Sequence, residues 1–578
     1  MDPRTAAHTL TRIAAFLELR GESTFKCRAY EQAARSLVAL DTDDLGALDR
    51  DGALARTPGL GKATLSVVRD LIETGESRYL TELQAGLPPG MTDLLRVPGL
   101  AISKVHLLHE RLGIDSVDAL EAAARDGRLA SVTRFGPKTA AKILRGIDIF
   151  RVSGTLSLYH RGAQRAHTLL AAVQAHPDVR RAEIAGAVRR HCETVGAAEI
   201  VAACSGDPHA VAASFARAPG VRAVSLEDTA SPRITFMDGA QLNLHCVHDA
   251  DFAVALWRHT GSAAHADTMC ALLAREGITL HADVLRDARG GSVSIATEAA
   301  LYKLLGLPFI HPEMREEGNE FLLAVAGKLP TLLEVHDIRG ALHCHSTYSD
   351  GKATIAELAD AARVRGWSYI GITDHSQAAF YAGGLARDRV LRQHDEIDAL
   401  NAASSGVRIL KGIEADILAD GALDYDADLL DRFDFVVGSI HSRFSMDRQR
   451  MTERVLRALD DPHLTVLGHP TGRLLLSRDP YPIDMEAVLE KAGAVGVAVE
   501  LNADPKRLDL DWRLLPRAKA LGVAIEIGPD AHSIRGLDNM TIGVGMARKA
   551  GIEAGDVLNA RRVDEVLTFA RARRAIQR

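Results

Sequence analysis

The chain has 578 residues, too many for one hydrophobic core, so several domains are expected. Its hydrophobic content of 47% and charged content of 25% are ordinary for a soluble globular protein, and no stretch approaches the roughly 18 uninterrupted apolar residues of a membrane span. The N-terminal segment lacks the apolar core of a signal peptide, so we expect a cytoplasmic protein with no membrane partner. The six cysteines include no CxxC pair, which argues against a zinc ribbon or a disulfide framework. The net charge of −7 does not favour nucleic-acid binding, so any such function must rest on local motifs.

Helical spacing of apolar residues runs through the first 150 residues, with glycine-containing breaks between the helices. We predict two all-α domains, residues 1–80 and 81–151. Three breaks lie directly before helices, and they contain Gly59, Gly61 and Lys62, then Gly99, then Gly136 and Lys138. A glycine turn at a helix N-terminus offers free N–H groups to a phosphate.

Together these turns resemble helix-hairpin-helix modules, which implies binding to the DNA backbone without sequence recognition. An ordinary turn between packed helices is the alternative for any single loop. Ala101 stands where the second hairpin should have glycine, so that loop is expected to grip less well.

Strand-like and helix-like segments are mixed from residue 152 to residue 255, which predicts an α+β domain. Residues 256–318 return to helices and turns, and residues 319–338 are predicted to link them to the last domain. From residue 339 to residue 578, strand and helix alternate seven times, which predicts a closed parallel α/β barrel. In such barrels the chemistry lies at the C-terminal ends of the strands.

In this last domain, polar side chains stand at or just after the C-terminal ends of successive apolar strands. In the segment ALHCHSTYSDG, His343 and His345 share one strand face while Cys344 points away. The full set is His343, His345, Asp350, His375, Glu414, His441, His469, Asp530 and His532. Imidazole and carboxylate ligands suit Zn²⁺, Mn²⁺ or iron, and a bridging glutamate can hold two ions that activate water and clamp a phosphate. A lone histidine after a strand is more often a core or capping residue, but nine such groups predict a metal centre.

These residues resemble the PHP (polymerase and histidinol phosphatase) domain. The resemblance implies a distorted seven-stranded barrel that holds up to three ions, Mn²⁺ or Zn²⁺, with catalytic roles for Glu414, Asp530 and His343. It implies three ligand sets, which are His343, His345, Glu414 and Asp530; Glu414, His441 and His469; and Asp350, His375 and His532. Arg473 in GHPTGR is expected to reach a substrate phosphate, although a surface arginine is an equal alternative.

The order of helical hairpins, sheet domain and PHP domain resembles bacterial family X DNA polymerases over nearly the whole chain. GAVRRHCETVG (186–196) is similar to the family's triphosphate-binding segment, and TEAALYKLLGLPFIHPEMRE (297–316) to the end of its thumb. The resemblance implies a palm at 152–255 and a thumb at 256–318. Arg189 and Arg190 are retained, so some affinity for phosphate or nucleotides is expected, the alternative being a solvated charged edge.

The polymerase's catalytic positions depart from the family pattern. Its first two carboxylates correspond here to Ala197 and Glu199, and the third to Asn243. Two-metal nucleotidyl transfer needs compact anionic ligands, so we do not expect Mg²⁺ to be held there, and polymerase activity should be weak or lost.

The N-terminal domain resembles the family's 5′-phosphate-binding domain, with Arg28 and Tyr30 as candidate phosphate contacts. The lyase lysine of eukaryotic repair members corresponds to Val67, and Schiff-base chemistry needs an amine, so no lyase is expected.

Three functions remain open from the sequence. The leading one is a DNA-repair enzyme whose PHP domain is a 3′→5′ exonuclease or phosphoesterase acting on DNA ends or gaps. The second is an active gap-filling polymerase with an attached PHP exonuclease. The third is a DNA-binding scaffold whose barrel hydrolyses a small phosphoester.

Overall fold

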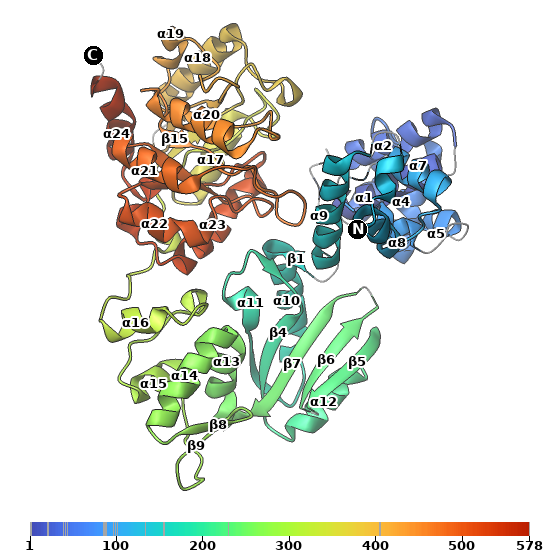
Figure 1. Cartoon of the computed structure of the whole chain (residues 1–578), viewed down its shortest axis with the longest axis vertical. Coiled ribbons are helices and arrows are strands. Elements are labelled where there is room, and N and C mark those ends of the chain that lie inside the picture. Colours follow the sequence, from blue (N-terminus) through green and yellow to red (C-terminus); the bar gives the residue numbers. More distant parts are fainter. Residues whose placement is uncertain are drawn as a thin grey trace. The chain divides into compact units, whose positions relative to one another are not determined.

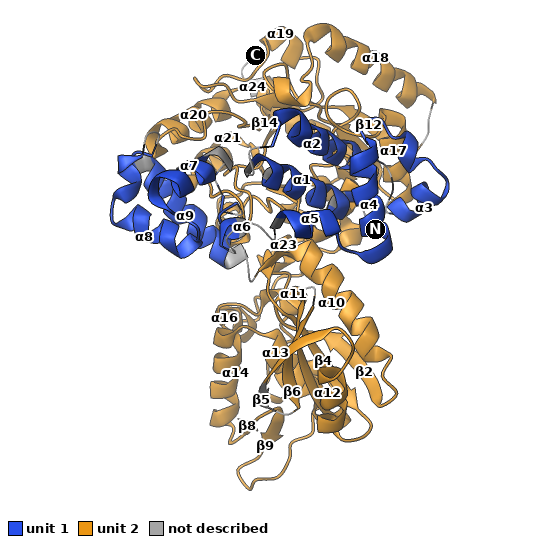
Figure 2. Ribbon diagram, turned by 90° about the vertical axis from the view of Figure 1, so that its right-hand side faces the viewer, with its two compact units in different colours: residues 1–154 blue, residues 155–578 orange. Residues whose placement is uncertain are grey.

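The computed structural model describes all residues except 1–2, 20–21, 39, 41, 43, 85–89, 96, 99, 101, 133–134, 154–155, 229, 238, 404–405 and 577–578. The chain forms two compact units, Met1–Gly154 and Thr155–Arg578 (Figure 2). The first unit therefore corresponds to the predicted helical region, and the second contains the predicted palm, thumb and PHP segments. No helix within the described residues is both long enough and apolar enough to cross a bilayer.

In the first unit, the regular elements of the described residues are all helices, as the apolar spacing predicted. Its α-helices are α1 (Pro3–Leu19), α2 (Thr24–Val38), α3 (Leu45–Arg50), α4 (Lys62–Thr74), α5 (Arg78–Gln84), α6 (Met91–Leu94), α7 (Ile102–Leu112), α8 (Val117–Arg125) and α9 (Pro137–Ser153). The largest helix contact is between α1 and α2, and one apolar cluster runs from Ala6 to Ile147, so the unit has its own core.

The second unit begins with a mixed five-stranded sheet in the order β2-β4-β7-β6-β5 (Figure 1). Strands β4 and β7 are parallel and the other neighbours antiparallel, which confirms the α+β prediction. The elements are β1 (Ser157–Leu158), α10 (Tyr159–Gln174), β2 (Val179–Ile184), α11 (Gly186–Arg189), β3 (Thr194–Val195), β4 (Ala198–Cys204), α12 (Pro208–Ala216), β5 (Val221–Asp228), β6 (Ser231–Phe236) and β7 (Gln241–His248).

A smaller helical segment with its own apolar cluster follows this sheet. It contains α13 (Phe252–Thr260), α14 (Ala263–Arg275), β8 (Thr279–His281), β9 (Val284–Arg286), α15 (Glu298–Leu304) and α16 (Glu320–Val325). The antiparallel hairpin β8–β9 was not predicted. Helix α16 is shorter than the apolar run 320–335 suggests, because Gly327 has a positive φ of 64° and Pro330 lacks an N–H.

The alternation predicted from residue 339 onward is confirmed. The elements are β10 (Gly340–Ala341), α17 (Ile355–Val364), β11 (Tyr369–Ile372), α18 (Arg387–Ala403), β12 (Arg408–Lys411), β13 (Glu414–Asp416), α19 (Ala427–Leu430), β14 (Val437–Ser439), α20 (Arg448–Asp460), β15 (Val466–Leu467), α21 (Met485–Val495), β16 (Ala498–Asn502), α22 (Leu515–Ala520), β17 (Ile525–Gly528), α23 (Asn539–Lys549) and α24 (Val563–Ile576).

The strands of this region form two parallel sheets in chain order, β10-β11-β12 and β13 to β17. A bridge between His375 and Glu414 connects the first sheet to the second, and a bridge between Cys344 and Ala531 connects the continuations of β10 and β17. The region has two apolar clusters. The larger contains residues of most of its helices and strands, and the smaller includes Tyr369 and Phe435. Helix α24 contributes Val566 and Ala570 to the smaller cluster.

Candidate metal centre

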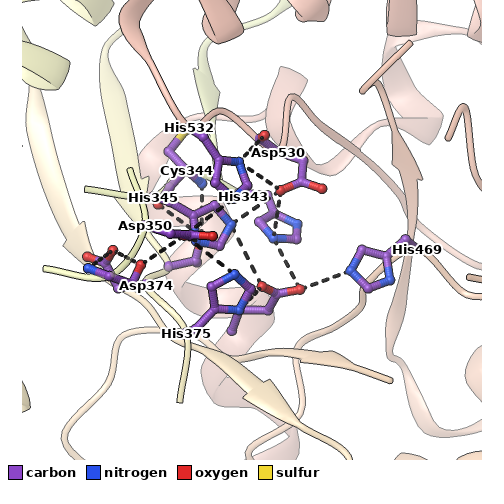
Figure 3. A network of polar contacts seen from close by, with 12 residues as sticks. His343, Cys344, His345, Asp350, Asp374, His375, His469, Asp530 and His532 are labelled. Carbon is purple, nitrogen blue, oxygen red and sulfur yellow. Dashed lines mark hydrogen bonds and ion pairs between the residues drawn. The ribbon is translucent and has the colours of Figure 1, made fainter. Parts of the chain in front are cut away.

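All nine predicted ligands lie in one cluster. Glu414 is the first residue of β13, and the other eight follow the C-terminal ends of parallel strands. Figure 3 shows the part of the cluster that includes His343, His345, His375 and Asp530. Glu414 is central to the group. Its Oε1 lies 3.4 Å from His343 Nε2, 3.3 Å from His441 Nε2 and 3.0 Å from His469 Nε2. Its Oε2 lies 2.8 Å from His375 Nδ1, so one carboxylate reaches two sides of the cluster.

Asp530 and Asp350 complete the cluster on the side of His345 and His532. Asp530 Oδ1 lies 3.3 Å from His345 Nε2 and 3.8 Å from His343 Nε2. Asp350 Oδ1 lies 3.4 Å from His532 Nε2 and 3.6 Å from His375 Nε2. These carboxylates are therefore shared between neighbouring imidazoles.

Several ligand atoms of the cluster are buried and, although some lie close to one another, form no hydrogen bond of suitable geometry among the described residues. They are His343 Nε2, both ring nitrogens of His345, His375 Nδ1, His469 Nδ1 and Glu414 Oε2. His343 and His345 have 0% exposure and Glu414 has 1%. Burying so many unsatisfied polar atoms costs free energy, and coordination to a cation removes that cost.

Three groups of side chains have ligand atoms close enough to hold one ion each. They are His345, Asp350, His375 and His532; His343, His345 and Asp530; and His375, Glu414 and His441. These groups overlap the sets implied by the PHP resemblance, with His345 and His375 shared between two groups. His469 reaches the third group through its contact with Glu414 Oε1.

Two further carboxylates orient the candidate ligands. Glu500 Oε1 lies 2.6 Å from His343 Nδ1, and Asp416 Oδ1 lies 2.7 Å from His441 Nδ1. Each imidazole therefore presents its Nε2 to the centre, which is the usual carboxylate–histidine–metal arrangement. Gly528 leaves room for Glu500, because a Cβ there would lie 2.0 Å from Glu500 Oε1.

The charges of the cluster divide its histidines into two classes. Burial alone would lower the pKa of His441, but Glu414 and Asp416 raise the pKa to about 9. His532 behaves alike, because Asp350 and Asp530 outweigh its burial and raise its pKa to about 9. Burial lowers the pKa of His345 to about 3, with help from the charges of His532 and His375. A neutral imidazole is the form that binds a metal, so His345 is ready to act as a ligand.

Two of the candidate ligands have backbone angles that side chains rarely adopt. His469 has a φ of 23° and Asp530 a φ of 48°. Each of these left-handed conformations costs of order 1–3 kcal/mol, and such conformations concentrate at functional sites. These two conformations lower the stability of the fold, and they direct both side chains into the cluster.

Arg473 does not face a substrate site as predicted, because its guanidinium is hydrogen-bonded to other residues of the protein. Its Nε donates to the carbonyl of Arg507, its Nη1 donates to Asp511 at 2.7 Å, and its Nη2 pairs with Glu193. Arg507 faces the cluster instead, with Nε 3.4 Å from Asp530 Oδ2 and a side chain that is 20% exposed.

The degenerate palm positions form a closed polar network. Glu199 on β4 and Asn243 on β7 are direct neighbours in the parallel register. Asn243 Nδ2 donates to Glu199 Oε1, and His245 Nε2 lies 2.8 Å from Glu199 Oε2. Arg233 Nε donates to Asn243 Oδ1 at 2.9 Å. The remaining carboxylate is thus engaged by an amide and an imidazole, and Ala197 adds no ligand atom.

Arg189 and Arg190 are engaged as well, so the expected phosphate contacts and the solvated-edge alternative both need correction. Arg189 forms two hydrogen bonds to Glu298, of 3.0 and 2.6 Å, and Arg190 Nε donates to Glu316 at 2.9 Å. These side chains are only 20% and 15% exposed.

The first of the three predicted hairpin turns has features suited to binding phosphate. Gly59 has a φ of 89°, and Gly61 precedes α4 without a side-chain cap, so the first N–H groups of the helix lack a capping side chain. Lys62 and Gly136 are exposed. Gly99, Ala101 and the side chain of Lys138 lie outside the described residues.

The candidate 5′-phosphate contacts of the first unit differ in exposure. Arg28 is exposed, whereas Tyr30 is only 4% exposed and stacks on Tyr79 with ring centroids 6.1 Å apart. Val67, at the lyase position, is buried in the helical core.

The sequence interpretation missed Asp416, Glu500 and Arg507. Asp416 could have been found, because it follows Glu414 by two residues and so shares its strand face. The orientation of Arg507 has no local sequence signal, since it depends on how its loop packs.

Comparisons with known proteins agree with this geometry. Family models match for a PHP domain over residues 341–503, a DNA polymerase beta thumb over 255–316, a helix-hairpin-helix domain over 1–77 and a SAM-like helix-hairpin-helix tandem over 91–148. A probable phosphatase of Thermoanaerobacter sp. is 32% identical over 38% of this chain and 88% of its own length. A probable phosphatase of Syntrophotalea carbinolica is 28% identical over 39% and 94%.

One curated relative spans the entire arrangement. The DNA polymerase/3′-5′ exonuclease PolX of Bacillus subtilis is 34% identical over 98% of this chain and 99% of its own length. The alignment covers the helical hairpins, the thumb and the PHP domain of this chain together. The chain therefore belongs to the PolX family of DNA polymerases with a C-terminal PHP domain.

Proposed function

We propose that the C-terminal domain is a metal-dependent phosphoesterase that degrades DNA from 3′ ends. The observation that supports this most directly is the cluster of buried imidazole and carboxylate ligand atoms around Glu414, several of which have no hydrogen-bond partner. The two parallel sheets are inferred to form one distorted seven-stranded barrel, and the cluster to hold up to three ions, Mn²⁺ or Zn²⁺. The polarity is supported by the name of the Bacillus relative.

Bound ions would supply an activated water and charge stabilisation for the phosphate. The protein holds His343 and His441 in the required tautomer through Glu500 and Asp416. Arg507 offers a guanidinium beside the cluster, where it can donate to a non-bridging phosphate oxygen. Glu414, Asp530 and His343 are proposed as the catalytic ligands.

The first unit is proposed to hold DNA through Gly59, Gly61, Lys62, Gly99, Gly136 and Lys138, with Arg28 at a 5′-phosphate. Backbone recognition suits gapped duplexes and 3′ ends of any sequence, and DNA repair is the matching role. Polymerase activity is proposed to be weak or lost, because Asn243 and His245 engage Glu199, the only carboxylate at the three metal-ligand positions. A small phosphoester is the second candidate substrate, and the matches to probable phosphatases favour it.

The test follows 5′-labelled single-stranded and gapped DNA in Mn²⁺. The parent should give a ladder that shortens from the 3′ end, and Asp530→Ala should give none. Asp360→Ala is the matched control, because Asp360 is an exposed residue of α17. Parent-like degradation by Asp530→Ala would show that the site is assigned wrongly.

A further inference from the structure

Two consecutive aromatic residues are exposed on the segment that follows His375, and one of them lies beside the metal centre. Phe380 is 83% exposed and Tyr381 is 71% exposed. They are the only aromatic residues of the second unit among the strongly exposed large apolar side chains of the described residues. Neighbouring exposed rings of this kind are unfavourable in water and commonly mark a binding surface.

Tyr381 lies at the edge of the cluster. Its ring centroid is 6.1 Å from that of His375 and 6.2 Å from that of His441. The ring therefore lies next to two candidate ligands, while most of its surface is open to a ligand.

The segment that carries both rings is anchored at each end. The N–H of Leu385 donates to the carbonyl of His375 at 2.9 Å, and the N–H of Ala378 donates to Asp424 at 2.6 Å. Gly384 permits this closure, because a Cβ there would lie 2.0 Å from the carbonyl oxygen of Ser376. The ring of Tyr381 is consequently held next to His375 on an anchored turn, and Phe380 is its neighbour in the sequence.

We propose that Tyr381, with Phe380 beside it, stacks on the unpaired 3′-terminal base of a DNA strand whose scissile phosphate lies in the metal centre. Aromatic side chains stack on any base, which gives affinity without sequence preference. Arg507 supplies the positive charge for the phosphate at the same site. In this arrangement the two rings hold a terminal base that is free of its complement. The inference rests on the proposed nuclease function and deepens it.

The test uses two 5′-labelled single strands that differ only at the 3′-terminal nucleotide, which carries a base in one and a tetrahydrofuran abasic analogue in the other. The rate of the first cleavage in Mn²⁺ is measured as kcat/KM. The parent should prefer the intact end by about tenfold, as expected for one stacked base. The double variant Phe380→Ala/Tyr381→Ala should lose this preference.

Two controls separate stacking from other effects. Tyr381→Phe keeps the ring and should retain the preference, and Val364→Ala removes an exposed side chain of α17 and should also retain it. Equal cleavage of both strands by the parent, or an undiminished preference in the double variant, would overturn the inference. Hydrolysis of bis(p-nitrophenyl) phosphate without cleavage of either strand would instead overturn the nuclease function on which it rests.

Discussion

At the residue scale, the centre depends on carboxylates that touch no proposed ion. Asp416 is 5% exposed and hydrogen-bonds to His441 Nδ1, which fixes the ring orientation and also raises the pKa of His441. Glu500 does the same for the orientation of His343. These are positioning residues, because they act on the substrate only through the ligands they hold.

Replacing Asp416 by Asn should weaken Mn²⁺ binding or activity by roughly 10–100-fold, the usual cost of losing such a partner. In the ion-free parent, His441 is protonated below about pH 9, so binding of an ion to its Nε2 must release a proton. Mn²⁺ affinity should therefore increase as pH rises toward 9, and the increase should be shallower in Asp416→Asn. Titration calorimetry at several pH values measures both effects, and a parent affinity independent of pH would contradict this reading.

The palm network leads to a prediction about synthesis. Gap filling in Mg²⁺ should be absent, because Glu199 is the only carboxylate at the three ligand positions and Asn243 and His245 engage its oxygens. The assay should use a His343→Ala background, so that degradation does not mask synthesis. Robust gap filling by that protein would overturn the claim.

A second variant tests whether missing carboxylates are the only reason for the absence of synthesis. Ala197→Asp with Glu199→Asp and Asn243→Asp restores three compact carboxylates. Arg233 would then face an aspartate at position 243 and compete with the metals for it. Synthesis should therefore return fully only when Arg233 is also replaced by a neutral residue.

At the element scale, the hairpin before α4 should carry part of the DNA affinity. Lys62 is exposed at the first position of the helix, next to uncapped N–H groups. Replacing Lys62 by Gln should weaken binding equally for unrelated DNA sequences and reduce the slope of log K against log salt by about one. Fluorescence anisotropy across a salt series measures this, with exposed Arg35→Gln on α2 as the comparison. An unchanged salt slope would remove Lys62 from the interface.

Elements with a clear apolar period could be predicted from the sequence. The strands before His375 and His469 are buried runs, Glu414 begins the buried strand β13, and these ligand types were visible without structure. Strand β5 was missed because it is an edge strand whose residues 222–225 are exposed, so it has no apolar face to detect. Arg473 and Arg507 could not be told apart, because the direction of a guanidinium depends on tertiary contacts.

At the scale of the whole molecule, Arg190 and neighbouring charged residues form ion pairs that connect segments of the second unit. Glu316 pairs with both Arg190 and Lys549, and Glu313 pairs with Arg548 at 2.7 Å. Burial alone would raise the pKa of Glu316, but Lys549 and Arg190 outweigh it and lower the pKa. These ion pairs join the palm and thumb segments to α23 of the PHP segment, so the palm has a structural role whether or not it synthesises DNA.

The central claim is that the cluster around Glu414 is a metal centre that cuts DNA. The most direct test titrates Mn²⁺ into the metal-stripped full-length chain while bound Mn²⁺ and cleavage of a labelled single strand are recorded together. The parent should gain activity in step with bound ions, and Glu414→Gln should lose both, because Glu414 contacts four of the candidate histidine ligands within 3.4 Å. Undiminished cleavage by the stripped parent, or parent-like binding and cleavage by Glu414→Gln, would contradict the account.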